Sequence, residues 1–416
     1  MKRRGLLGAA VALAGLPVRA AVKPRVLVVG GGYGGATAAK HLRLLSGGAI
    51  DVTLVEPEEA FVSCPMSNLV LEGSQPLSVL IRSYAALQSR HGVKVLRDSV
   101  VTIDPVKKTA TLASGAVLGW DKLVLSPGVD MVWDSVEGLA AARGQILQAW
   151  KAGAETLALR RQLEAMPDGG VFAIAIPEAP YRCPPAPYER ACLVAAYFKR
   201  AKPKSKVLVI DANEDLTSKG ALFRKVWAED YKGIVDYQPQ TKTVAVDAAT
   251  KTLKFEIQED LRADVLNVLP VMRAGDIAVR AGLANGNARW VGVKFPDFES
   301  TAAADVHVIG DSIQIAPAMP KSGHMAMSQG KALAVLLTSQ LSGSGKPAAV
   351  PRLASTCYSF VDAKRAMHIA SEHEYVAAEK TYLPVHGVGG SSDAPSAAEG
   401  EEAWRWARDV WSEVLA

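Results

Sequence analysis

The chain has little cysteine and no cysteine motif that attaches a haem. Its four cysteines are Cys64, Cys183, Cys192 and Cys357, and no CxxCH sequence occurs among the 416 residues. The chain therefore does not carry a c-type haem of its own. A free cysteine usually behaves as a small buried hydrophobe, so a structural thiol is the default interpretation of each one.

Outside the N-terminus, the positive and negative charges of the chain nearly balance. The formal net charge is +5, but Lys2, Arg3, Arg4 and Arg19 supply four positive charges, which leaves +1 for the rest of the chain. This balance gives no indication of nucleic-acid binding. The apolar run at 5–18 is too short to cross a bilayer comfortably, so we expect no membrane span.

Residues 1–21 instead predict a signal peptide. A basic start and an apolar run precede a small-residue cleavage site at Val18-Arg19-Ala20. The Arg3–Arg4 pair indicates twin-arginine export, although the consensus is incomplete. We therefore expect a periplasmic protein, in which disulfides can persist. Four cysteines allow three complete pairings, and their spacing does not choose among them.

A glycine fingerprint for dinucleotide binding follows the first apolar strand, RVLVV. Gly30, Gly32 and Gly35 have GxGxxG spacing at the start of a helical segment, and Glu56 ends the next strand about 20 residues later. Such glycines let the backbone approach a pyrophosphate at a helix N-terminus, and the acid can bind a ribose hydroxyl. Because strand, glycine loop, helix and acid follow one another in the expected order, an incidental glycine-rich turn is a poor explanation for the motif.

Two later features favour FAD as the dinucleotide. Asp311 ends the strand pattern VHVIGD before PKSGHMAMSQGKA, which is how flavoproteins with two dinucleotide domains hold the ribitol and pyrimidine end of the flavin. A plain helix N-cap is the alternative for Asp311. Gly128, in SPGVD after another apolar strand, is predicted to lie at the same cofactor.

The second block of α/β pattern lacks this glycine loop. Its first strand leads into AIAIPEAPYRCPPAPYERA, which has five prolines and no glycine. Proline removes backbone N–H donors and fixes φ, so the loop cannot cradle a pyrophosphate as the glycine version does. We infer that this domain keeps the architecture without binding a nicotinamide cofactor.

These patterns predict an α/β fold with parallel strands buried on both faces. We expect two dinucleotide-binding-type domains, arranged as in glutathione reductase, and a C-terminal interface domain. The expected divisions are 1–21 (signal peptide), 22–135 and 266–345 (FAD-binding domain), 136–265 (degenerate NAD-type domain) and 346–416 (C-terminal domain). Within them we predict a linker at 342–351, a Gly/Ser/Ala-rich loop at 387–399 and a C-terminal amphipathic helix with Trp404, Trp406 and Trp411.

The chain resembles the flavoprotein subunit of flavocytochrome c sulfide dehydrogenase along essentially its whole mature length. The resemblance is carried by SCPMSN, RCPPAPYERA, MPKSGHMAMSQGKA and STCYSF, in that order around the fingerprint. Glutathione-type disulfide reductases share the expected architecture, but their CxxxxC pair is missing. The resemblance implies that Cys64 is bound through sulfur to the 8α-methyl group of FAD. It also implies a redox-active Cys183–Cys357 disulfide on the other side of the flavin, with Glu189 nearby.

Simpler interpretations remain open for several of these residues. The Cys183–Cys357 disulfide could be a structural staple, and Glu189 could be an acid stabilised by a helix dipole. Lys321 is a candidate for positive charge near the pyrimidine edge of the reduced flavin, or an ordinary loop lysine. Cys192, in the helical run ACLVAAYF, is predicted to be an inert buried thiol.

The resemblance further implies oxidation of hydrosulfide to zero-valent sulfur or polysulfide, with electrons passing to a separate c-type cytochrome subunit that carries haem c. That subunit would form a heterodimer across the FAD domain and C-terminal segment. The three tryptophans could contribute to this interface or pack within their own helix. The 387–402 insertion departs from the best-known family members. Alternatives are a sulfide:quinone oxidoreductase, which would need an apolar membrane-inserting C-terminus, and a non-catalytic flavoprotein subunit of a sulfur-oxidising complex.

Overall fold

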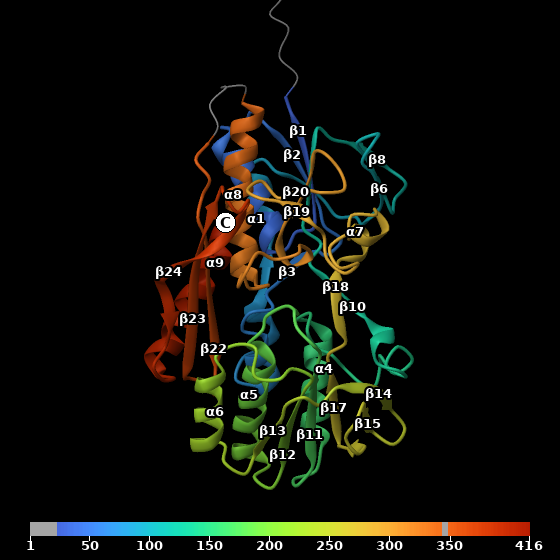
Figure 1. Cartoon of the computed structure of the whole chain (residues 1–416), viewed down its shortest axis with the longest axis vertical. Coiled ribbons are helices and arrows are strands. Elements are labelled where there is room, and N and C mark those ends of the chain that lie inside the picture. The colour runs from blue at the N-terminus through green and yellow to red at the C-terminus, as the bar shows by residue number, and fades with distance from the viewer. Residues whose placement is uncertain (1–22, 343–347) are drawn as a thin grey trace, which may run out of the picture.

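The computed structural model describes residues 23–342 and 348–416 (Figure 1). The predicted signal peptide and residues 343–347 of the predicted linker lie outside the described residues. Figure 1 shows the FAD-binding domain at the top, the central domain at the bottom and the C-terminal segment along one side of both.

The glycine fingerprint follows β1, an interior strand of a seven-stranded sheet with the order β19-β20-β21-β9-β1-β2-β5. Strand β1 (Arg25–Val29) pairs in parallel with β2 (Asp51–Val55) and with β9 (Lys122–Leu125). Val26, Leu27 and Val28 are all buried, as predicted for a strand covered on both faces. The other strands are β5 (Lys94–Leu96), β19 (Val293–Lys294), β20 (Glu299–Ser300) and β21 (Val306–Val308).

Two helices pack closely beside this sheet because glycines remove side chains from their contact. They are α1 (Tyr33–Leu45), which follows the fingerprint, and α8 (Gly323–Leu341), which follows Asp311. A Cβ at Gly330 would lie 2.5 Å from the carbonyl oxygen of Gly34, inside van der Waals contact. Because the two helices approach closely at these glycines, the loops that precede them, with Gly32 and Asp311, lie at the same end of the sheet.

The central domain contains a parallel sheet with the order β13-β12-β11-β17. Because β17 completes this sheet, the domain continues past the expected division at residue 265. Its strands are β11 (Val171–Ile176), β12 (Lys206–Asp211), β13 (Val235–Gln238) and β17 (Val265–Val268). Its helices are α4 (Ala154–Ala165), α5 (Ala186–Ala201) and α6 (Gly220–Glu229). The domains are joined by the antiparallel pair of β10 (Val129–Val132) and β18 (Val271–Ala274).

The C-terminal segment forms the antiparallel sheet β22 (Leu353–Phe360), β23 (Ala366–Val376) and β24 (Thr381–Ser391), followed by α9 (Ala397–Leu415). The prediction of a loop at 387–399 was wrong, because most of those residues belong to β24 and α9. Strand pairing uses backbone groups, so a glycine-rich stretch can still pair. A Cβ at Gly389 would lie 2.3 Å from the carbonyl oxygen of Ala370 on β23.

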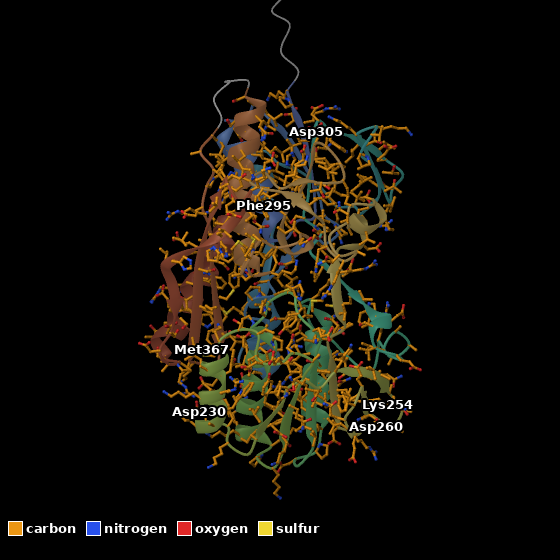
Figure 2. All side chains as sticks on the ribbon, viewed as in Figure 1. Asp230, Lys254, Asp260, Phe295, Asp305 and Met367 are labelled. Carbon is orange, nitrogen blue, oxygen red and sulfur yellow. The ribbon has the colours of Figure 1, made fainter. Side chains whose placement is uncertain are left out.

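This segment is attached to both domains. Lys40 of α1 donates hydrogen bonds to the carbonyl oxygens of Ser412 and Glu413 in the last turn of α9, at 3.2 and 2.9 Å. Arg365 forms a 3.0 Å ion pair with Asp230 after α6. Figure 2 marks this junction, where Asp230 lies below Met367 of the C-terminal sheet.

Short elements complete the fold, including antiparallel strands that the sequence pattern did not predict. They are β3 (Ala60–Val62), β4 (Ile81–Ser83), β6 (Val100–Asp104), β7 (Thr109–Leu112), β8 (Val117–Gly119), β14 (Thr243–Asp247), β15 (Thr252–Phe255), β16 (Leu261–Arg262), α2 (Ser67–Glu72), α3 (Ala85–Ser89), α7 (Asp276–Arg280), η1 (Leu77–Leu80), η2 (Trp133–Ser135) and η3 (Gly310–Ser312). None of the helices in the described part of the chain has the length and apolar character needed to cross a membrane.

Candidate active site

A cavity of about 560 Å³ is lined by residues of the FAD-binding domain, the central domain and the C-terminal segment. Of the eleven predicted site residues, nine line this cavity. They are Gly30, Gly32, Glu56, Cys64, Gly128, Cys183, Glu189, Asp311 and Cys357. Gly35 and Lys321 are not among the residues that line it.

The fingerprint end of the cavity leaves room for a pyrophosphate. A Cβ at Gly32 would meet no atom within 4 Å, so this glycine is not required by packing within the protein. A Cβ at Gly35, in contrast, would lie 1.9 Å from the carbonyl oxygen of Gly30. Glu56 accepts a 2.6 Å hydrogen bond from the backbone N–H of Gly31, which fixes the acid beside the loop. Gly32 therefore borders a space that a bound group can fill, whereas Gly35 packs the helix onto the loop.

Asp311 presents an unpaired acceptor at the other end of the site. Its side chain is buried, and its Oδ1 atom has no hydrogen-bond partner among the described residues. Burial raises the pKa of this carboxyl. An unpaired buried acceptor is costly, and a ligand hydroxyl would satisfy it. The open space at Gly32 and this acceptor both fit FAD, with the pyrophosphate at the fingerprint and ribitol hydroxyls at Asp311.

Lys321 lies beside the cavity but directs its ammonium group to the protein backbone. Nζ donates hydrogen bonds to the carbonyl oxygens of Asp311 and Ile313, at 2.9 and 2.6 Å. It also lies 3.5 Å from the centre of the Trp290 ring. Burial lowers the pKa of Lys321 to about 7. Lys321 thus supports the loop that carries Asp311, and its carbonyl oxygen accepts a 2.8 Å hydrogen bond from the N–H of Cys183.

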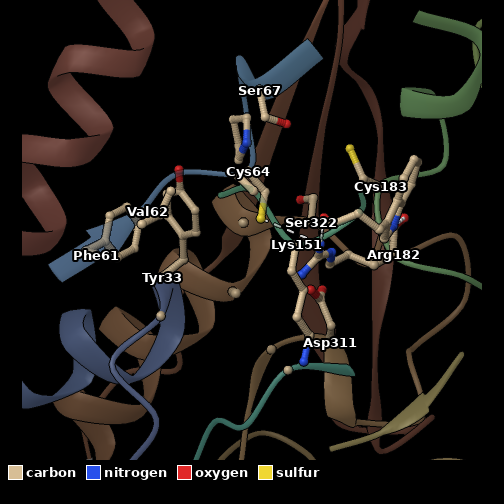
Figure 3. Close-up of a pocket in the computed structure, with 18 of the residues that line it drawn as sticks. Tyr33, Phe61, Val62, Cys64, Ser67, Lys151, Arg182, Cys183, Asp311 and Ser322 are labelled. Carbon is tan, nitrogen blue, oxygen red and sulfur yellow. Dashed lines mark hydrogen bonds between the residues drawn. The ribbon is translucent and has the colours of Figure 1, made fainter. Parts of the chain in front are cut away.

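Cys64 reaches the cavity from the short loop between β3 and α2. The loop is held by a 2.8 Å hydrogen bond between Tyr33 and Ser63, and Met66 turns it with φ of 72°. Arg182 donates a 3.5 Å hydrogen bond to the Cys64 sulfur. Figure 3 shows Cys64 and Cys183 entering from different parts of the chain, with Asp311 below them.

Cys183 and Cys357 line the same cavity although they come from different modules. Cys183 follows β11 in the proline-rich loop and has φ of 59°, whereas Cys357 lies in β22. The structure holds all four cysteines as free thiols. Burial raises the pKa of both cavity thiols, and the neighbouring Cys357 raises that of Cys183 further. Cys192 is buried elsewhere in α5 and accepts a 3.2 Å hydrogen bond from Trp227, as expected for an inert thiol.

Glu189 connects the central domain to the C-terminal sheet. It lies in the first turn of α5, where the helix dipole favours an acid, and it also lines the cavity. Its carboxylate accepts hydrogen bonds from the N–H of Phe360 and from the amide of Asn68, each at 2.8 Å. Burial raises its pKa. Glu189 can therefore hold a proton at higher pH than an exposed glutamate.

Two cations near the thiols were not predicted from the sequence, the half-buried Arg182 and the buried Lys219. Burial alone would lower the pKa of Arg182, but Cys64, Asp311 and Cys183 raise it. Lys219 donates a 2.9 Å hydrogen bond to the carbonyl oxygen of Cys357. Arg182 could have been suspected because it precedes a predicted site cysteine. No motif surrounds Lys219, so the sequence carried no signal for it.

The three tryptophans of α9 have different surroundings. Trp406 lines the cavity together with His324 and Tyr358, and its indole N–H donates a 3.4 Å hydrogen bond to His324. Trp411 is buried and donates a 3.3 Å hydrogen bond to Tyr33. Trp404 lies 6.3 Å from Phe360 between ring centres. Only Trp406 of the three therefore borders the site.

Family comparisons agree with this arrangement. Residues 156–270 match the central region of "Sulfide dehydrogenase [flavocytochrome c] flavoprotein chain". Residues 349–415 match the flavin-binding region of flavocytochrome c sulphide dehydrogenase, and residues 24–161 match pyridine nucleotide-disulphide oxidoreductase. The chain is also 65% identical over 46 residues to the sulfide dehydrogenase flavoprotein chain of Chlorobaculum thiosulfatiphilum, covering 94% of that relative and 11% of this chain. The chain belongs to the flavocytochrome c sulfide dehydrogenase flavoprotein family.

More distant relatives of this family member share its fold. It is 25% identical over 312 residues to the mitochondrial sulfide:quinone oxidoreductase of Mus musculus. That match covers 69% of this chain and 65% of the relative, so the chain spans just under two thirds of the relative's length. The solved sulfide:quinone oxidoreductase of Aquifex aeolicus has a TM-score of 0.79 at 18% identity, covering 94% of this chain and 91% of that one. The predicted α/β fold class is confirmed.

Proposed function

We propose that this protein oxidises hydrosulfide to zero-valent sulfur or polysulfide. The observation that carries the proposal is the meeting of Cys183 and Cys357 with Cys64 and the glycine fingerprint on one cavity. Thiol–disulfide exchange proceeds when a thiolate or a comparable sulfur nucleophile attacks a disulfide. A pair of cysteines beside a flavin site suits such a nucleophile, and membership of a sulfide dehydrogenase family supports the choice of hydrosulfide.

FAD is the cofactor in this proposal, attached through the Cys64 sulfur. Glu56, Gly32 and the helix α1 N-terminus would hold its adenosine and pyrophosphate, and Asp311 would accept from its ribitol. Bound there, FAD supplies a two-electron acceptor for the thiol pair.

The sulfur and proton chemistry is carried out by the cysteine pair and Glu189. A Cys183–Cys357 disulfide accepts the incoming sulfur and leaves a persulfide on one cysteine and a thiolate on the other. Glu189, whose pKa is raised by burial, can hold or release a proton beside this pair. A second nucleophile then displaces the added sulfur from the persulfide.

The electron acceptor that follows is proposed to be a c-type cytochrome subunit in the periplasm. The chain has no CxxCH of its own, so the haem belongs to a partner. Trp406 of α9 and Tyr358 of β22 are partly exposed and border the cavity, which makes the surface that these two residues share the favoured contact surface. The relation to sulfide:quinone oxidoreductases makes a quinone the competing acceptor.

Stopped-flow mixing with sulfide tests the proposal. The flavin absorbance of the wild-type protein should bleach, whereas Cys357→Ser should retain its flavin without bleaching. Cys192→Ser is the matched control and should behave as wild type. Normal bleaching of Cys357→Ser would show that the disulfide has only a structural role. No bleaching of the wild type would favour a non-catalytic subunit. Reoxidation by cytochrome c rather than by a soluble quinone distinguishes the two acceptors.

A further inference from the structure

Arg190 is a buried cation of α5 that donates four hydrogen bonds to neutral oxygen atoms. It is 2% exposed, and two of its acceptors are the carbonyl oxygens of Gln148 and Ala149, at 2.9 and 2.7 Å. The other two are the amide oxygens of Asn267 and Asn68, at 2.8 and 3.0 Å. A guanidinium group has only donors, so the atom of Asn68 that faces Arg190 is the amide oxygen.

This contact fixes the orientation of the buried Asn68 side chain. With its oxygen on Arg190, Asn68 directs its NH2 group to the other side, where Nδ2 donates a 2.8 Å hydrogen bond to Oε2 of Glu189. The same NH2 group donates a 3.3 Å hydrogen bond to the carbonyl oxygen of Ala186. The reversed amide would place two donors face to face at Arg190 and two oxygens face to face at Glu189. Asn68 is therefore a hydrogen-bond donor to Glu189.

The carboxylate of Glu189 is thus held by three parts of the chain. Asn68 of α2 donates to Oε2, and the N–H of Phe360 in β22 donates to Oε1, each at 2.8 Å. Each carboxylate oxygen has one N–H donor, and hydrogen bonds of this kind favour the ionised form of an acid. Glu189 and Asn68 both line the cavity that contains the cysteine pair.

The charges that face Glu189 come from α5 and from the loops that precede α5 and α6. Burial raises the pKa of Glu189, and the two N–H donors, Lys219 and Arg190 oppose that rise. The Cys183 thiol faces the same carboxylate, because burial, Cys357 and Glu189 together raise its pKa. The protonation of Glu189 therefore depends on its hydrogen bonds as well as on the charges around it.

We propose that Asn68 positions Glu189 and keeps its carboxylate ionised until a proton is released at the cysteine pair. In that step the proton leaves an S–H group of the added sulfur and arrives on a Glu189 oxygen, so the sulfur becomes anionic and the carboxyl neutral. No electrons change owner. The inference rests on the proposed function, and it assigns a role to the last residue of SCPMSN, the segment that also carries Cys64. Asn68 acts through Glu189 and is a positioning residue.

An infrared titration of the Glu189 carboxyl tests the contact. The C=O absorption of this carboxyl is isolated by subtracting spectra of the oxidised holoprotein that carries Glu189→Gln, at each pH. In Asn68→Leu, which removes the donor at similar volume, the midpoint pH should rise by about one to two units, because a hydrogen bond to a charged group is lost. This is about 10- to 100-fold less carboxylate at a fixed pH below the midpoint. A midpoint equal to that of wild type would overturn the inference.

Two further variants keep this test decisive. Asn68→Asp retains the shape and the acceptor for Arg190 but replaces the NH2 group with a second acid, so the midpoint should rise at least as far. An unchanged midpoint in Asn68→Asp would overturn the inference even if Asn68→Leu folds poorly. Asn285→Leu is the control, since Asn285 is exposed and donates a 2.8 Å hydrogen bond to Thr301, and it should leave the midpoint unchanged.

The pH profile of sulfide-dependent bleaching separates this inference from the proposed function. In Asn68→Leu the profile should move to higher pH by the same amount as the carboxyl midpoint, because the proton transfer needs an ionised Glu189. A raised midpoint with an unmoved profile would overturn the proton transfer. Wild-type flavin that does not bleach at any pH, together with a raised midpoint in Asn68→Leu, would count against the proposed function and support the contact.

Discussion

Replacing Gly32 with alanine should weaken FAD binding while the protein stays folded. Gly32 has φ of −70° and ψ of −167°, which alanine adopts freely, and its Cβ would meet nothing within 4 Å. At the N-cap of α1, alanine costs up to about 1 kcal/mol, and the lower entropy of the unfolded chain offsets about 0.4–1 kcal/mol. The free energy of unfolding should therefore change by less than about 1 kcal/mol.

The methyl group should instead collide with the cofactor that the space accommodates. Inserting a methyl into a close contact costs about 1–3 kcal/mol, which corresponds to roughly 5- to 150-fold weaker binding. The measurement is an FAD titration of the apoprotein, followed by flavin fluorescence. It is done in a Cys64→Ala background, so that binding is reversible whether or not the wild type forms a thioether.

Gly35→Ala provides the contrast, since its Cβ would lie 1.9 Å from the carbonyl oxygen of Gly30. This variant should lose stability in urea unfolding as well as FAD affinity. The reasoning is refuted if Gly32→Ala binds FAD as tightly as its parent, because a pyrophosphate then does not occupy the space beside the loop.

Three further predictions concern attachment, pH and cofactor choice. Acid precipitation should leave yellow colour on the wild-type protein and release it from Cys64→Ala; equal release from both would exclude a covalent bond. Lys321 has its pKa lowered from 10.5 to about 7 by burial, so the stability it contributes is present above pH 10.5 and is lost as the pH falls toward 7. Relative to Lys321→Met, wild-type stability in urea should fall over that range, and a constant difference would contradict this. NADH should not reduce the flavin in anaerobic absorbance measurements. Asp211, at the end of β12, has the place of the acid that binds the ribose of NAD, but it already accepts hydrogen bonds from Tyr188 and Tyr237, at 2.7 and 3.2 Å. Rapid reduction by NADH would refute this prediction.

The sequence could predict those parts of the fold that local pattern determines. The RVLVV strand, the glycine loop and Glu56 are close in the chain, and each has a backbone requirement that is visible in its residue type. The same holds for the proline-rich loop that carries Cys183. Cys357 lies in a distant segment, and only the family resemblance, not the residue spacing, placed it at the site.

The missed features depend on tertiary packing. Lys219 reaches Cys357 through a left-handed turn in a loop without any motif, and burial rather than sequence context gives it a role. For Lys321 the sequence allowed either a charge near the flavin or an ordinary loop lysine, and only the fold places its ammonium group on nearby carbonyl oxygens. Gly389 and Gly390 form a strand because β23 supplies the pairing, which composition alone does not reveal.

The attachment of the C-terminal segment has a consequence for the order of biosynthesis. Cys357, Tyr358 and Trp406 complete a cavity whose first wall, at Gly30, is made much earlier on the ribosome. Lys40 of α1 finds its carbonyl partners at Ser412 and Glu413 only when α9 has emerged. During most of translation the nascent chain thus has an incomplete cofactor site. We therefore expect the full set of contacts around the cofactor site to form only after the C-terminal segment has been synthesised and has packed against α1.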